Sequence, residues 1–134
     1  MKRLLLALFI SACHPVPATA ELPPVDIPAN IVDMMNSDAA AVCDMVDDLT
    51  DRQECLDIMF DGYVEAIQMG AGSVNVNQSI ASVIELSSSM NGCTNVITPI
   101  CNAQTANWSS YYMFGQRNKE KLNESSHADS LHPN

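Results

Sequence analysis

The cysteines are the residues of this chain best placed to do covalent chemistry. There are five, at positions 13, 43, 55, 93 and 101. Eleven residues separate Cys43 from Cys55, and seven separate Cys93 from Cys101. Neither spacing matches the CxxC pairs of zinc sites or of thioredoxin-type redox proteins. The last four cysteines are therefore predicted to form two structural disulfides in an oxidising compartment.

The pairing of these four cysteines has three alternatives. Local pairing, Cys43–Cys55 and Cys93–Cys101, is favoured because Cys43 and Cys55 lie at nearly equal distances from the turn predicted at Leu49-Thr50. Such positions face each other in an antiparallel helical hairpin. Cross-pairing would instead link the two halves of the domain. Loops as short as the local ones would stabilise the fold by roughly 3 kcal/mol each.

Histidine and lysine, the usual general bases and nucleophiles, are missing from the central part of the chain. The three histidines are His14, His127 and His132, and residues 26–115 contain no lysine. The many carboxylates are expected on solvent-facing sides of helices, where they are poor acid–base catalysts. The sequence therefore predicts a protein that is not an enzyme and that uses no cofactor.

A dense acidic run, Asp44, Asp47, Asp48 and Asp51, could attract calcium. It lacks the alternating oxygen ligands and the central glycine of an EF-hand loop. On a helix these four residues share one side, which is simply a solvated face. No metal site is predicted here, and a calcium-stabilised module is kept as the third functional alternative.

The charge of the chain is concentrated in its middle. The formal charge is -10, but residues 26–115 hold twelve acids against Arg52 alone, a charge of -11. Contacts to phosphate need Lys and Arg, so nucleic-acid binding is excluded. The acids could serve solubility, repel anionic membranes or attract a basic protein partner. The candidate binding face for such a partner is Glu54, Asp57, Asp61 and Glu65.

Four of the seven aromatic residues lie between positions 108 and 114. They either close one end of the core or are exposed as contact anchors, since Trp and Tyr are frequent in protein interfaces. Trp108, Tyr111 and Tyr112 form this second candidate binding site, the aromatic end.

Residues 1–20 are predicted to be a signal peptide. A cationic start, Met1 to Arg3, precedes an apolar stretch of nine residues, Leu4 to Ala12, which is too short to span a bilayer. Cleavage can follow Ala18-Thr19-Ala20, or it can precede Cys13 if Ile10-Ser11-Ala12-Cys13 is a lipobox. In the second case Cys13 becomes a lipid anchor. Either route exports the protein to the periplasm, as a soluble or an outer-membrane-anchored form, and only the lipid would contact a membrane.

The periodicity of apolar residues predicts an all-α fold, a small disulfide-stapled bundle of about four helices arranged as two helical hairpins. The helices are expected near residues 37–49, 50–70, 77–90 and 98–115, with residues 31–35 extending the first or forming a separate turn. Their expected start signals are Ser37, a capping box at Thr50, Asn77 and Thr98-Pro99, and Gly115 is the expected stop of the last helix.

The helical domain is predicted to lie between a linker and a C-terminal tail. Residues 21–30 form a Pro-rich linker, residues 31–115 the helical domain, and residues 116–134 a polar tail that is expected to be disordered.

In general form the chain resembles small exported helical proteins of bacteria, namely immunity proteins against secreted effectors, pilot lipoproteins of secretion systems and acid-stress chaperones. No functional residue is transferred from these groups. The leading hypothesis is an exported, non-enzymatic protein-binding module of the bacterial envelope, in one version an inhibitor or immunity-type protein. The alternative is a lipid-anchored assembly or pilot-type lipoprotein.

Overall fold

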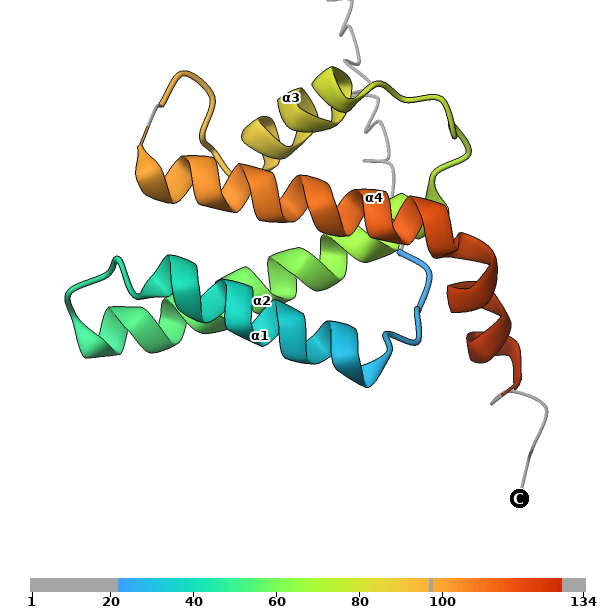
Figure 1. Ribbon diagram of the computed structural model, residues 1–134, viewed down its shortest axis with the longest axis horizontal. Coiled ribbons are helices and arrows are strands. Elements are labelled where there is room, and N and C mark those ends of the chain that lie inside the picture. Colours follow the sequence, from blue (N-terminus) through green and yellow to red (C-terminus); the bar gives the residue numbers. More distant parts are fainter. Residues whose placement is uncertain (1–21, 97, 129–134) are drawn as a thin grey trace, which may run out of the picture.

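The computed structural model describes residues 22–96 and 98–128, and its regular secondary structure there is entirely helical. The four helices are α1 (Ala29–Cys43), α2 (Leu49–Gly72), α3 (Ile80–Met90) and α4 (Pro99–Ala128). In Figure 1, α4 lies across the middle, with α3 on one side and the α1–α2 pair on the other. The predicted all-α bundle is confirmed. None of these described helices is both long enough and apolar enough to cross a membrane.

Each hairpin is closed by one disulfide near its turn. Cys43 and Cys55 join α1 to α2 with a Cα–Cα distance of 5.8 Å. Cys93 and Cys101 join the segment after α3 to the first turn of α4, with a Cα–Cα distance of 5.6 Å. The predicted local pairing is therefore confirmed, and the two hairpins are held together by non-covalent packing, chiefly of α2 against α4.

The first helix starts and ends earlier than expected. It begins at Ala29, because Ile31 extends the apolar stripe of Met35, Ala39 and Val42 by one turn. It ends at Cys43 instead of continuing to residue 49, so the acidic run after it lies mostly in the connecting loop. The prediction that its four carboxylates share one helical side is wrong.

Two predicted helix caps are displaced by two residues. Asp48 caps α2 in place of Thr50, and its carboxylate accepts from the Thr50 backbone N–H at 2.8 Å. Ser79 caps α3 in place of Asn77, and its hydroxyl accepts from the Ser82 N–H at 3.2 Å. The Thr98-Pro99 start is confirmed, since the Thr98 hydroxyl accepts from Cys101 N–H at 3.1 Å. Side-chain oxygens therefore still satisfy the free N–H groups of these helix starts.

The fourth helix does not stop at Gly115 but continues to Ala128. The expected disordered tail at 116–134 is therefore wrong for residues 116–128, while 129–134 lie outside the described residues. Leu122, only 3% exposed, belongs to the main core cluster. It follows Tyr111 and Gly115 along the same side of α4, and this apolar continuation explains why the helix persists.

Glycines set the distance between α2 and α4. A Cβ atom on Gly70 would overlap the Tyr112 carbonyl oxygen, and one on Gly115 would overlap the Ile67 carbonyl oxygen. The two helix backbones therefore touch at a crossing that only glycine permits. Gly115 was expected to end the last helix, whereas it lies in the interior of α4.

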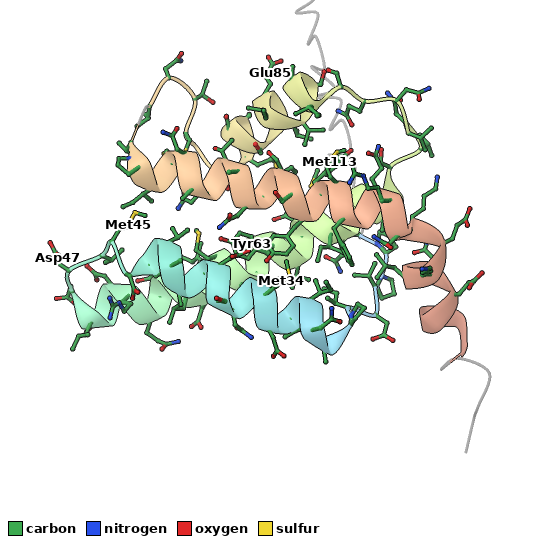
Figure 2. All side chains as sticks on the ribbon, in the orientation of Figure 1. Met34, Met45, Asp47, Tyr63, Glu85 and Met113 are labelled. Atoms are coloured by element: carbon green, nitrogen blue, oxygen red, sulfur yellow. A yellow bond between two sulfur atoms is a disulfide. The ribbon has the colours of Figure 1, made fainter. Side chains whose placement is uncertain are left out.

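The core lies between α2 and α4 and is covered by α1 and α3. In Figure 2, Tyr63 lies between the helices, whereas Asp47 and Glu85 point outward. Within the Pro-rich linker, the described residues 22–28 are not helical, but Val25 and Ile27 pack against the core. The linker therefore belongs in part to the folded domain.

Candidate functional site

The aromatic end is not an exposed surface. Trp108, Tyr111 and Tyr112 are 2%, 3% and 4% exposed, respectively. The ring of Tyr111 lies 4.7 Å from that of Tyr63, and the ring of Trp108 stacks 5.5 Å from that of Tyr112 (centroid distances). The expectation that these residues are exposed as contact anchors is wrong, because the α2–α4 contact buries them.

The hydroxyl groups of these tyrosines connect α4 to the rest of the fold. Tyr111 donates to a carboxylate oxygen of Asp38 on α1 at 2.6 Å, and Tyr112 donates to the side-chain carbonyl of Gln78 at 2.8 Å. Tyr63 accepts from the Asn107 amide at 3.0 Å. Burial raises the pKa of both Tyr63 and Tyr111, and the hydrogen bond to Asp38 raises the pKa of Tyr111 further. Both phenols are therefore neutral, structural groups near pH 7.

The four carboxylates predicted as a binding face do form one surface feature. They lie at helical spacings of three and four residues along α2, and three are exposed while Glu65 is half-buried. None of them forms an ion pair within the described residues. We call this row the acidic ridge, and it consists of Glu54, Asp57, Asp61 and Glu65.

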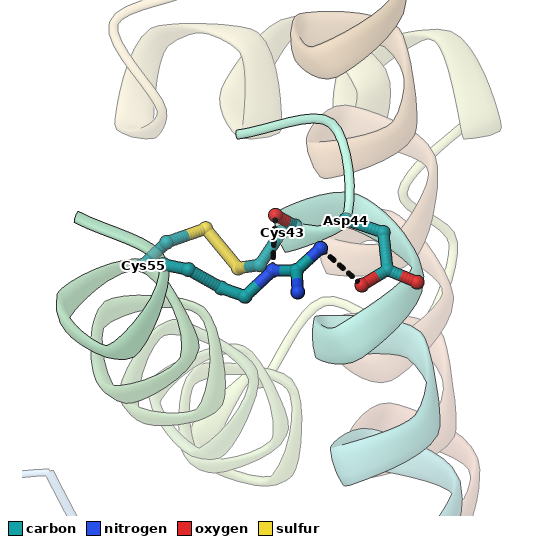
Figure 3. A network of polar contacts seen from close by, with 4 residues as sticks. Cys43, Asp44 and Cys55 are labelled. Carbon is teal, nitrogen blue, oxygen red and sulfur yellow. Dashed lines mark hydrogen bonds and ion pairs between the residues drawn. A yellow bond between two sulfur atoms is a disulfide. The ribbon is translucent and has the colours of Figure 1, made fainter. Parts of the chain in front are cut away.

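The only cation of residues 26–115 is engaged elsewhere. The Arg52 guanidinium pairs with the Asp44 carboxylate at 2.8 Å, and its Nε donates to the Cys43 carbonyl at 3.4 Å (Figure 3). Arg52 thus covers the C-terminal end of α1 beside the first disulfide. Arg52 therefore does not compensate the charge of the acidic ridge.

The acidic run proposed for calcium is used in helix capping. Asp44 pairs with Arg52, and Asp48 caps α2. In the part of the chain that the structure describes, no three residues of His, Cys, Asp or Glu are grouped as a metal would need. Two of the four carboxylates, those of Asp44 and Asp48, therefore have local structural partners.

A groove between α1 and α2 borders one side of the acidic ridge. Its volume is about 640 Å³, and Ala39, Leu56 and Phe60 contribute apolar surface to it. Asp57 and Asp61 contribute carboxylates to the same groove. We call it the α1–α2 groove. An apolar surface with an anionic edge is suited to a cationic amphipathic chain.

A cavity of about 420 Å³ borders the other side of the ridge, between α2, the end of α3 and α4. Asp61 and Glu65 line it from α2, Asn91 follows α3, and Trp108 lies on α4. We call it the α2–α4 cavity. Sequence reasoning missed it, because its walls come from three helices that meet only in the folded chain.

A third depression, of about 520 Å³, lies between α3 and α4. Its lining includes Ile80 and Ile84, which are 68% and 46% exposed, and Arg117. Of the large apolar residues of α3, only Val83 is buried. This face is apolar and lacks carboxylates, in contrast to the acidic side.

The comparisons with known proteins give no relative. No protein-family model matches the chain, and no curated protein or solved structure matches it significantly. The remaining candidate residue, Cys13, lies outside the described residues.

Proposed function

We propose that this protein is an exported, non-enzymatic binding module whose acidic ridge holds a basic, amphipathic segment of a protein partner. An inhibitor or immunity-type role would be one concrete form of this activity. The observation that carries the proposal is the acidic ridge itself. Its four carboxylates form no ion pair within the described residues, and the ridge lies between two depressions with apolar surface.

The energetics of α2 support a binding role for the ridge. Like charges one helical turn apart destabilise a helix by roughly 0.2–0.5 kcal/mol per pair. Asp57–Asp61 and Asp61–Glu65 are two such pairs on the same helix. A cationic partner would remove this repulsion on binding, and the long-range field of the domain would accelerate its approach.

The proposal is tested by reversing charge on the ridge. The double variant Asp57→Lys/Asp61→Lys should lose the partners that the immobilised wild-type protein retains from envelope and secreted fractions. Both residues are exposed, so circular dichroism should show an unchanged fold.

A matched control places the same charge change elsewhere. Asp26→Lys/Glu85→Lys also replaces two exposed acids by two lysines, but away from the ridge. Partners should be retained by this control at moderate ionic strength. Equal loss of partners from both double variants, or no loss from the ridge variant, would contradict the proposal.

Export is part of the same proposal. Two disulfides suit an oxidising compartment, as the sequence also indicates. Mass spectrometry of the mature protein would decide between the two forms. An N-terminus at Glu21 means a soluble module, a lipid-modified Cys13 means an anchored one, and an intact Met1 would contradict export.

A further inference from the structure

The α2–α4 cavity brings together three polar groups that have no partner within the described residues. Asp61 and Glu65 are one turn apart and form no ion pair within the described residues. The side-chain nitrogen of Asn91 is buried, yet it has no hydrogen-bond acceptor in that same part of the chain. Two negative acceptors and one donor therefore surround the same space.

Apart from Gln104, the remaining walls of the cavity are apolar or aromatic. Ile58 and Met90, which are 56% and 44% exposed, flank it together with Met59. Tyr63 and Trp108 contribute parts of two aromatic side chains that are otherwise buried. A ligand that fits must combine a long apolar stem with a cationic end, and it must offer a hydrogen-bond acceptor to Asn91.

We propose that the α2–α4 cavity is the anchor pocket for one arginine side chain of the partner segment. The inference rests on the proposed function, which it narrows to a particular residue. The arginine stem packs on Ile58, Met59 and Met90, while the guanidinium lies between the carboxylates of Asp61 and Glu65.

Geometry favours arginine over lysine for this position. Side chains one turn apart on a helix are separated by about 5–6 Å at Cβ, a span that a planar guanidinium with five N–H donors can bridge. The Asn91 amide rotates readily about its terminal torsion and can then donate to a main-chain carbonyl of the partner. All three unpartnered groups of the cavity are satisfied by this one residue.

The experiment is a titration of the full mature protein, followed by two-dimensional ¹H–¹⁵N NMR. The probe is N-acetyl-arginine N-methylamide, which provides the side chain and two carbonyl groups. We expect saturable shifts at the Asn91 side-chain amide, the Trp108 indole N–H and the Gly62 amide. The citrulline analogue has the same shape without the charge, and it should bind at least about tenfold more weakly.

Two variants locate the contact. Glu65→Gln should weaken binding of the probe about fivefold, the upper range for one partly exposed charge pair. Glu54→Gln removes the same charge from the ridge outside the cavity, and it should leave the affinity within about twofold. Both substitutions preserve the size and shape of the side chain. The ¹H–¹⁵N spectrum of each variant shows directly whether the protein is folded.

Three results would overturn the arginine pocket. They are the absence of saturation, equal binding of the citrulline analogue, and equal weakening by Glu54→Gln and Glu65→Gln. The broader proposal fails separately, when Asp57→Lys/Asp61→Lys retains every partner. If the ridge variant loses its partners but the probe does not saturate, the binding module stands and the pocket is rejected.

Discussion

Replacing Gly115 by alanine should destabilise the protein, although the same change stabilises an ordinary helix. Gly115 lies in the interior of α4, where alanine has a helix propensity about 1 kcal/mol better than that of glycine. The added Cβ atom, however, would overlap the carbonyl group of Ile67 on α2. The obstacle is backbone, so the two helices must separate.

The magnitude follows from the two opposing effects. Overpacking a core costs about 1–3 kcal/mol, and the rigid backbone at this contact places Gly115→Ala at the upper end. After subtraction of the gain in helix propensity, we expect a net loss of about 2 kcal/mol in the free energy of unfolding. For a domain of this size the midpoint of thermal unfolding should fall by about 10 °C.

The assay is urea unfolding with the disulfides intact, monitored by circular dichroism and by the fluorescence of the single tryptophan, Trp108. Gly62→Ala is the matched control, because a Cβ on Gly62 in α2 would meet nothing within 4 Å. This control should be more stable than the wild type by up to about 1 kcal/mol. A Gly115→Ala protein as stable as Gly62→Ala would refute the glycine-dependent crossing.

Two further predictions concern the tyrosines and the first disulfide. Folding raises the pKa of Tyr63 and Tyr111 above the ordinary value of about 10, so their contribution to stability is complete below that pH. This contribution to the free energy of unfolding should decrease as the pH rises above about 10, by up to about 1.4 kcal/mol per pH unit for each tyrosine. Urea unfolding at a series of alkaline pH values should therefore show a smaller dependence of stability on pH for Tyr111→Phe than for the wild type. An unchanged dependence would contradict this. Replacing Cys43 and Cys55 by serine removes a disulfide between residues that are 12 positions apart. In the same assay the free energy of unfolding should fall by about 3 kcal/mol, whereas a loss below about 1 kcal/mol would contradict the entropic account.

The number of helices and the disulfide pairing could be predicted because both depend on local information. Apolar spacings of three and four residues define the helices, and the short separations of Cys43–Cys55 and Cys93–Cys101 favour closure within each hairpin. The row of carboxylates along α2 was likewise visible, since its members lie on one helix. Exact caps were less predictable, because Asp48 and Thr50 both have oxygens that can accept from the first turn.

Tertiary packing decided what the aromatic residues and glycines do. Trp108, Tyr111 and Tyr112 belong to residue types that are frequent in protein interfaces, but the close approach of α2 and α4 places them in the core. Gly115 resembles a helix stop in sequence, and only the neighbouring Ile67 backbone shows that its missing side chain is needed for packing.

The sequence by itself determined a disulfide-linked, all-α domain with its negative charge on the first two helices, because periodicity, spacing and charge are properties of neighbouring residues. The tertiary structure alone decided which of the described carboxylates form no ion pair in this part of the chain, and which of them border a cavity. Asp61 and Glu65 meet Asn91 there, although about thirty residues separate them along the chain, because three helices must first pack together.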